Sequence, residues 1–382
     1  MASSSSLALV LFYFSALSLS HPLNAVVFPV SRDLPTGQYV AQIRLGESPE
    51  PVKLVVDLSG TILWFDCSSS SSSSRNLTSG NSSDCARARA GAHRVSSSRG
   101  DDSVCQLLIR NGVMGFSARG ELAGDFLAVG SDSSATSPGA VDLLFACAPR
   151  WLLRGLAGEA HGVLGLGRAQ ISLPSQLVSE TIERRRFTVY LLPTNGVVST
   201  SSAEVVFGAE VSRLLVYTPL FTDPSGNYVI NVKSIRVNGV KISVNAPLSA
   251  ELSTVIPYTV VESSIYMMIA ESLAEAATAT ATAVAPFGLC FADTTPIPAV
   301  EFALQSEMVR WRIHGRNLMV DVGGGIRCLG IIDGGSGRVN PIVMGGLQLE
   351  GFVLDFDLGN SVLGFGQRRT GSVSNSLPLE AL

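Results

Sequence analysis

The chain has 382 residues, of which 46% are hydrophobic and 15% charged, and its formal net charge is -4. This length suggests two domains or one large β unit. The hydrophobicity excludes an intrinsically disordered chain, and the lack of a basic excess argues against a nucleic-acid-binding protein. We therefore expect a globular protein without a nucleic-acid partner.

The chain begins with serines and an apolar run at residues 7–19. This run is too short to span a bilayer, and the small Ser18 and Ser20 lie at its end. We interpret residues 1–20 as a secretory signal peptide, although no Lys or Arg precedes the run and cleavage after Ala25 would also fit. A buried strand is the alternative. No second segment reaches membrane length, so we expect a secreted protein without membrane contact.

In a secreted protein, disulfide bonds are the expected state of the cysteines. Their number is even, and none shows the C-x-x-C spacing of a metal site. The simplest arrangement has two bridges among the first four cysteines, with the pairing open, and one bridge between the last two. The six are Cys67, Cys85, Cys105, Cys147, Cys290 and Cys328.

Two N-x-Ser/Thr sequons, at Asn76 and Asn81, lie in the serine-rich run 68–83. A glycan at a sequon requires an exposed position in a secreted protein. The run therefore predicts a glycosylated surface loop.

Short β-runs separated by Gly and Pro make up most of the remaining chain. The expected strands include 38–45, 52–58, 204–208, 228–237 and 352–356. Helical periodicity is confined to 173–183 and to a segment from 263 to about 282. The Ser/Thr/Gly-rich stretch 193–203 is the expected linker between an N-terminal β lobe, 26–192, and a C-terminal β lobe, 204–382.

The two expected lobes repeat one sequence pattern. In the first, an apolar strand ends in D-L-S-G at 57–60, and the glycine-rich G-V-L-G-L-G follows at 162–167. In the second, L-S-T-V at 252–255 is followed by P-I-V-M-G-G at 341–346. A loop-bearing strand and a later apolar strand that ends in glycine, found twice, indicate a duplicated lobe.

This pattern resembles the pepsin-like aspartic proteases over essentially the whole mature chain. Further blocks with family-like sequence lie at 145–149, 252–258, 285–290, 317–322 and 345–357. These blocks narrow the resemblance to the TAXI-type xylanase inhibitors of cereals and their relatives, the extracellular dermal glycoproteins and basic seed globulins. The resemblance implies an all-β, bilobal pepsin-like (peptidase A1) fold with a few short helices. It also implies a plant protein of the apoplast or cell wall with little or no protease activity.

In the pepsin-like family, two aspartates share a proton and activate water between the lobes. Asp57 lies at the first position, but Leu58 and Ser59 replace the hydroxyl residue and the glycine of the family's loop. Ser253 lies at the second position, where a hydroxyl cannot share a proton with a carboxylate. The flap tyrosine expected around 110–113 is also missing. The sequence predicts a vestigial dyad, and an aspartic endopeptidase with an unusual dyad is the alternative.

Other sites are weakly supported. I-I-D at 331–333 looks like a second aspartate loop, but Gly345 follows too soon, so we interpret Asp333 as a turn residue in a Gly-rich hairpin loop. The four histidines show no paired spacing, and the glycines of 162–167 do not fit a dinucleotide fingerprint. We therefore expect no metal and no cofactor.

In the inhibitors that the chain resembles, C-terminal loops and a histidine near the C-terminus enter the glycosidase cleft. Thr370 lies where that histidine is expected, so Arg368 and Arg369 are the candidate partner contacts, with a solvated tail as the alternative. The expected function is inhibition of a microbial xylanase or related cell-wall glycoside hydrolase in plant defence, by a monomer. A storage or signalling role like that of the seed globulins is a third interpretation.

Overall fold

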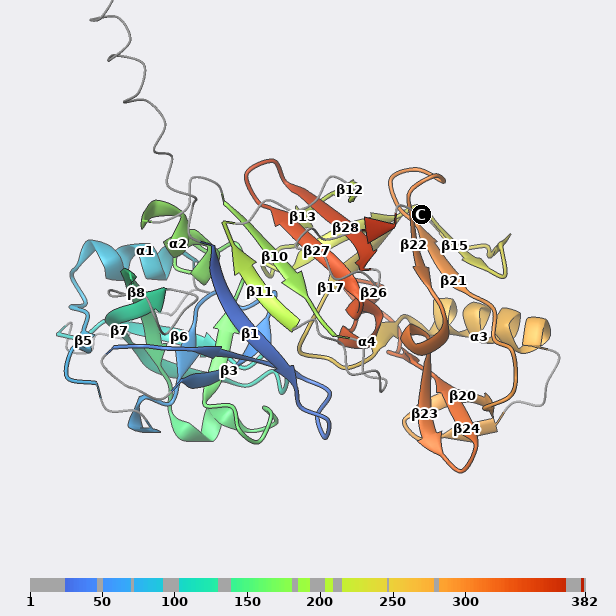
Figure 1. Cartoon of the computed structure of the whole chain (residues 1–382), viewed down its shortest axis with the longest axis horizontal. Helices are drawn as coiled ribbons and strands as arrows, with labels where there is room; N and C mark the ends of the chain where they lie inside the picture. The colour runs from blue at the N-terminus through green and yellow to red at the C-terminus, as the bar shows by residue number, and fades with distance from the viewer. Residues whose placement is uncertain are drawn as a thin grey trace, which may run out of the picture.

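A computed structural model describes a mostly β protein with a few helices (Figure 1). The residues that it describes are 25–46, 51–69, 72–91, 103–129, 139–180, 185–192, 203–208, 215–245, 247–277, 282–368 and 379–380. The expected signal peptide, 1–20, lies outside them. Among the described residues, no helix is long and apolar enough to cross a membrane.

One large 15-stranded sheet combines strands from the beginning, the middle and the end of the chain. Its main path runs β12-β28-β27-β10-β11-β1-β2-β3-β9-β4-β8-β7-β5, with β29 beside β28 and β6 beside β7. The strands are β1 (Val26–Arg32), β2 (Tyr39–Ile43), β3 (Val52–Asp57), β4 (Trp64–Phe65), β5 (Asn76–Leu77), β6 (Gln106–Arg110), β7 (Ser117–Val129), β8 (Gly139–Cys147), β9 (Gly162–Gly165), β10 (Arg186–Tyr190), β11 (Ala203–Phe207), β12 (Val216–Pro219), β27 (Phe352–Asp357), β28 (Val362–Arg368) and β29 (Leu379–Glu380).

Three smaller sheets follow in the second half of the chain. The first contains β13 (Phe221–Thr222), β14 (Tyr228–Val232), β17 (Leu248–Leu252), β26 (Ile342–Met344), β18 (Thr259–Val261) and β25 (Ile331–Asp333). The second contains β16 (Val240–Lys241), β15 (Ser234–Val237), β21 (Val300–Ala303) and β22 (Arg310–Ile313). The third contains β19 (Thr282–Val284), β20 (Phe287–Ala292), β24 (Ile326–Leu329) and β23 (Met319–Gly323).

The helices among the described residues are α1 (Ser83–Gly91), α2 (Leu173–Glu180), α3 (Ser263–Ala277), α4 (Gly346–Leu349) and three 3-10 turns, η1 (Cys67–Ser69), η2 (Arg150–Leu153) and η3 (Gly315–Asn317). Two of these α-helices, α1 and α4, and the 3-10 turns were not predicted. The expectation of only two helical segments was wrong, because α1 lacks apolar periodicity and α4 is a single turn. The expected end of α3 near 282 was also wrong, since Thr282 begins β19.

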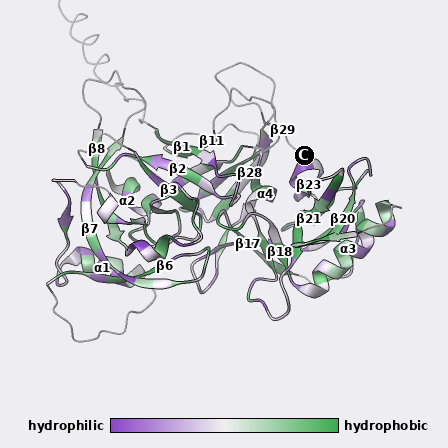
Figure 2. Ribbon diagram, turned by 90° about the horizontal axis from the view of Figure 1, so that it is seen from below, coloured by the Kyte–Doolittle hydropathy of each residue, from purple (hydrophilic) through white to green (hydrophobic). Residues whose placement is uncertain are grey.

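Helix α3 shows the predicted periodicity most clearly. Its buried residues Ile265, Ile269, Leu273 and Ala277 recur every fourth position and so line one face. Figure 2 shows both hydrophobic and hydrophilic residues along this helix. Its apolar face therefore packs on the protein interior while its polar face meets solvent.

The expected strand at 228–237 is two strands in different sheets. β14 pairs with β17, whereas β15 pairs with β21. Between them the Lys233 N–H donates to Ala303 O at 2.7 Å, where the chain changes its partner strand. A continuous β-run in sequence cannot reveal such a change of partner.

The division into lobes at 193–203 stays a prediction, because residues 193–202 lie outside the described part of the chain. Ala203, the last residue of the expected linker, is instead the first residue of β11 and pairs with Val30 of β1. The sequence analysis included Ala203 in the linker because a serine/threonine run leads directly into β11.

Aromatic side chains from distant segments pack in the interior beside β27, β10 and β11, which are neighbours in the large sheet (Figure 1). Phe187 stacks on Phe356, with ring centroids 4.7 Å apart. Tyr228 packs on Phe356 at 5.1 Å, and its hydroxyl donates to Leu166 O at 3.0 Å. This bond ties β14 to the residue that follows β9, next to the Asp57 loop.

All six cysteines form disulfides. The predicted Cys290–Cys328 bridge is present and joins facing residues of β20 and β24. The pairing left open by the sequence is Cys67–Cys147 and Cys85–Cys105. Disulfides of this kind are typical of proteins that pass through the secretory pathway.

Candidate functional site

The Asp57 loop forms where two parallel strands meet. Asp57 is the last residue of β3 and lies opposite Gly165 of β9. Its carbonyl accepts from Leu166 N at 2.9 Å, and its Oδ1 accepts from Ser59 N at 2.9 Å. A Cβ on Gly165 would lie only 2.4 Å from Ile62 O, so only glycine fits here. The glycine-ended strand thus fixes the loop that carries Asp57.

The Ser253 loop repeats this arrangement in the second half of the chain. Leu252 at the end of β17 pairs in parallel with Met344 of β26, and Ser253 N donates to Met344 O at 2.9 Å. A Cβ on Gly345 would lie 2.3 Å from the carbonyl carbon of Tyr258. The repeat that the sequence predicted is therefore present as two loop-bearing strands, each beside a strand followed by or ending in glycine.

The two loops touch through one side chain. The Thr254 hydroxyl donates to Val56 O at 2.6 Å and accepts from Leu58 N at 3.3 Å, entirely within the interior. Leu58 has no hydroxyl with which to return these bonds. The structure therefore brings the Asp57 and Ser253 loops together. The side-chain hydrogen bonds between them come from Thr254, and the Leu58 side chain provides none in return.

The hairpin of β6 and β7 covers Asp57. A Cβ on Gly112, at its tip, would lie 3.1 Å from Asp57 Oδ2 and 3.7 Å from Val255 Cγ2. The Asp57 side chain is accordingly buried, with 6% of the residue exposed. In place of a flap tyrosine, the tip of the hairpin brings glycine backbone next to the Asp57 carboxyl.

Asn111 holds the tip of this hairpin in place, and the sequence analysis missed it. Its Nδ2 donates to Leu152 O at 2.7 Å and to Arg154 O at 2.9 Å, while its Oδ1 accepts from Val113 N at 2.9 Å. Asn111 is fully buried. The Asn-Gly dipeptide at 111–112 was the available signal, because it marks a hairpin turn.

Burial raises the pKa of the Asp57 carboxyl, because the charged form loses its solvation. The backbone N–H groups of Ser59 and Gly60 and the charge of Arg110 oppose this shift. A carboxyl with a raised pKa can hold a proton and donate it, but it has no second carboxylate at Ser253 to act as base.

This shift predicts a gain of stability in the Asp57→Asn variant at neutral pH. A folded-state pKa above the unfolded value means that stability falls as pH rises past the unfolded pKa, about 4 for Asp, and the amide does not ionise. We expect a higher unfolding temperature than wild type at pH 7 and no difference near pH 3, by calorimetry. An equal or lower unfolding temperature at pH 7 would contradict the shift.

Asp333 is not in a hairpin loop, contrary to the sequence prediction. It ends β25, which pairs in parallel with β18. Its Oδ1 accepts from Ser263 Oγ at 2.6 Å and Gly335 N at 2.9 Å, so it lies at the start of α3. These bonds lower the pKa of this exposed carboxyl. The glycines that follow Asp333 in sequence are typical of a turn, and the parallel pairing of β25 with β18 leaves no local signal.

The remaining predicted site residues lie at the surface or outside the described residues. Asn76 and Asn81 are both exposed; Asn76, however, lies in the short strand β5 and not in a loop. Arg368 ends β28, and its side chain, like Arg369 and Thr370, is outside the described part. Within the described residues, no group of three potential ligand side chains could hold a metal ion.

Comparison with known protein families agrees with this arrangement. The model described as xylanase inhibitor N-terminal matches residues 39–209, and that described as xylanase inhibitor C-terminal matches residues 227–367. The chain belongs to the TAXi xylanase-inhibitor family. The predicted family membership is thus confirmed.

Individual relatives extend over nearly the whole chain. The probable aspartic proteinase GIP2 of Nicotiana benthamiana is 35% identical to it, over 90% of this chain and 88% of the relative. The crystal structure of edgp superposes with a TM-score of 0.80 at 33% identity, over 91% of this chain and 96% of that chain. An aspartic proteinase from Irpex lacteus, with a TM-score of 0.66 at 19% identity over 91% and 99% of the two chains, shares the fold. The predicted all-β, pepsin-like fold is confirmed.

Proposed function

We propose that this TAXi-family chain is a non-proteolytic, secreted protein that inhibits a cell-wall glycoside hydrolase, such as a microbial xylanase. The observation that carries the proposal is the position of Ser253, on the loop that meets the Asp57 loop. Pepsin-like chemistry needs two carboxyls that share one proton, and a serine hydroxyl does not titrate in that range.

The covered state of Asp57 supports the same proposal. An attacking water must lie within hydrogen-bond reach of its general base. Here the backbone of Gly112 lies next to the carboxyl, and Asn111 fixes the hairpin that carries Gly112. A peptide substrate would have to displace this anchored hairpin to reach one carboxyl.

A surface that binds an intact partner remains the natural use of such a fold, since exposed loops on a rigid scaffold carry most binding functions. The partner class comes from the family, whose two models both carry the description of a xylanase inhibitor. Glycoside hydrolases hold paired carboxyls in their clefts, and a cationic side chain is a charge-assisted match for them. Arg368 and Arg369, followed by Thr370, are the proposed contacts. We place the protein in the plant apoplast as a monomer with a defence role.

Titration of the purified protein into two xylanases, one of jelly-roll and one of TIM-barrel fold, tests this function. We expect saturable, equimolar loss of activity against at least one of them. The Arg368→Ala/Arg369→Ala variant is expected to inhibit at least tenfold more weakly, whereas Arg87→Ala, on the distant α1, is expected to inhibit like wild type. Full xylanase activity at micromolar protein would overturn the xylanase proposal.

An acid endopeptidase with an unusual dyad is the second candidate. It is supported by the raised pKa of Asp57 and by the name of the relative GIP2, a probable aspartic proteinase. It predicts pepstatin-sensitive cleavage that Asp57→Asn abolishes, a result that the inhibitor proposal excludes.

A further inference from the structure

A surface pocket of about 510 Å³ lies where the large sheet meets two of the smaller sheets. β12 contributes Thr218, β13 contributes Phe221 and β14 contributes Asn231, while β16 contributes Lys241 and the turn after β21 contributes Gln305. This volume lies within the range of small-molecule sites in proteins. The pocket is far in sequence from the Asp57 loop and has no part in the function proposed above.

The pocket is cationic. Lys233 and Lys241 both line it, and no Asp or Glu is among its described lining residues. Lys233 forms no ion pair within the part of the chain that the structure describes. Lys241 Nζ lies 3.9 Å from Glu307 Oε1, at the long limit of an ion pair. Two ammonium groups are therefore available to an anionic ligand.

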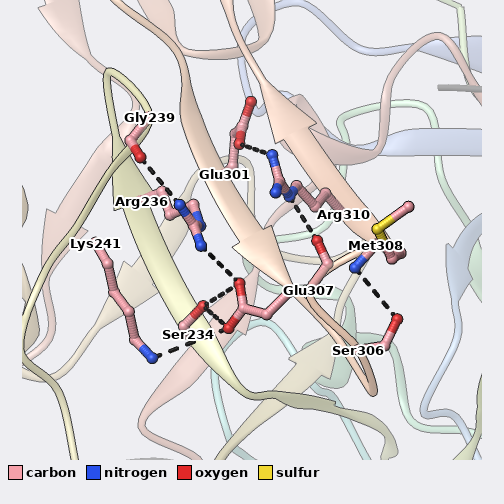
Figure 3. A network of polar contacts seen from close by, with 9 residues as sticks. All are labelled: Ser234, Arg236, Gly239, Lys241, Glu301, Ser306, Glu307, Met308 and Arg310. Atoms are coloured by element: carbon pink, nitrogen blue, oxygen red, sulfur yellow. Dashed lines mark hydrogen bonds and ion pairs between the residues drawn. The ribbon is translucent and has the colours of Figure 1, made fainter.

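Glu307 is already satisfied by other groups (Figure 3). Its carboxylate accepts from Ser234 Oγ at 3.0 Å and from Arg236 Nη2 at 3.0 Å. Arg310 Nε donates to the Glu307 carbonyl at 2.7 Å. The bonds from Arg236 and Ser234 lower the pKa of Glu307, so it stays ionised in mildly acidic solution. The turn between β21 and β22, which supplies one wall of the pocket, is thus held in place without the help of Lys241.

The other walls offer an apolar face and amide groups. Phe221 is 46% exposed, and Pro219 and Pro247 also line the pocket. The Gln305 Nε2 donates to Tyr217 O at 2.7 Å, which fixes this amide and leaves Oε1 as an acceptor. The exposed Asn231 adds a second amide. An aromatic face, two hydrogen-bonding amides and two cations match a ligand with C–H faces, hydroxyls and carboxylates.

We propose that this pocket binds an anionic oligosaccharide of the uronic-acid class. The carboxylates lie at Lys233 and Lys241, one sugar face packs on Phe221, and ring hydroxyls bond to Asn231 and Gln305. Two separate lysines suit carboxylates that are spaced along a chain, whereas a single phosphate favours a planar arginine fork or several converging N–H groups. The open, partly polar pocket does not suit a lipid tail.

Isothermal titration calorimetry of the full chain with trigalacturonate tests this site, with its methyl ester, xylotriose and citrate as comparison ligands. We expect saturable binding of trigalacturonate and no binding of its methyl ester or of xylotriose, because neither carries carboxylates. Lys233→Gln/Lys241→Gln should weaken binding about tenfold, as should Phe221→Ala. Arg312→Gln is the matched control, because it removes a charge from neighbouring β22 but does not line the pocket.

Three outcomes would overturn the proposal. The first is no binding of trigalacturonate at millimolar concentration, and the second is the same affinity in wild type and the double-lysine variant. The third is citrate binding that is as tight as that of trigalacturonate and unaffected by Phe221→Ala, which would make the pocket a general anion site. None of these outcomes depends on whether the protein inhibits a glycoside hydrolase.

Discussion

The Arg186→Met variant is expected to lose about 3–5 kcal/mol of the free energy of unfolding at pH 7. Arg186 on β10 forms two bonds to Asp355 on β27, one of them from Nε to Oδ1 at 2.7 Å. Asp355 is completely buried, so methionine leaves a carboxylate without its cation in the interior. Denaturant titration measures this loss.

The pH dependence of the loss identifies its cause. Burial raises the pKa of Asp355 and Arg186 lowers it, so removal of Arg186 raises it further. The deficit should therefore shrink as pH falls and the carboxyl takes up a proton. Lys53→Met, which breaks the exposed pair with Glu159, is the matched control and should cost less than about 1 kcal/mol. Equal losses in both variants would show that the buried pair has no special role.

The Gly165→Ala variant is expected to lose about 3 kcal/mol through a clash of backbone atoms. A Cβ there would lie 2.4 Å from Ile62 O and 2.7 Å from Gly60 O. Neither atom is the flexible end of a side chain, so the Asp57 loop must shift. Thermal unfolding followed by circular dichroism measures the loss.

Gly158→Ala is the control for this experiment. Gly158 is exposed and a Cβ on it would meet nothing within 4 Å, so we expect a change within about 0.5 kcal/mol. If Gly165→Ala were as stable as Gly158→Ala, the close approach of the Asp57 loop to β9 would be wrong. The result concerns architecture only, since the proposed function needs this loop for the fold and not for catalysis.

Local sequence pattern and family resemblance were enough to predict the fold, most of the expected strands and the Asp57 and Ser253 loops. The loops were predictable because an apolar strand that pairs in parallel with a glycine-ended strand has a short, recognisable sequence pattern. The prediction of one strand at 228–237 was wrong, because the change of partner strand after Val232 depends on Ala303, a residue far along the chain. The prediction of a hairpin loop at Asp333 was also wrong, because the partner strand β18 is not adjacent to β25 in sequence.

The environment of the site was less predictable than its position. Nothing local to Asn111 specifies that its amide bonds to Leu152 and Arg154, so the anchored hairpin over Asp57 emerged only in three dimensions. The pocket at Lys233 and Lys241 was missed for the same reason, because its walls come from three sheets. Isolated lysines carry no signal in sequence.

We propose that the protease fold persists in this protein without protease chemistry. The most direct test of this proposal is an acid-pH cleavage assay of an unfolded protein substrate by the purified chain, with and without pepstatin, followed by mass spectrometry. We expect no cleavage above that of the Asp57→Asn variant at any pH. Pepstatin-sensitive cleavage by the wild-type chain that Asp57→Asn abolishes would contradict it.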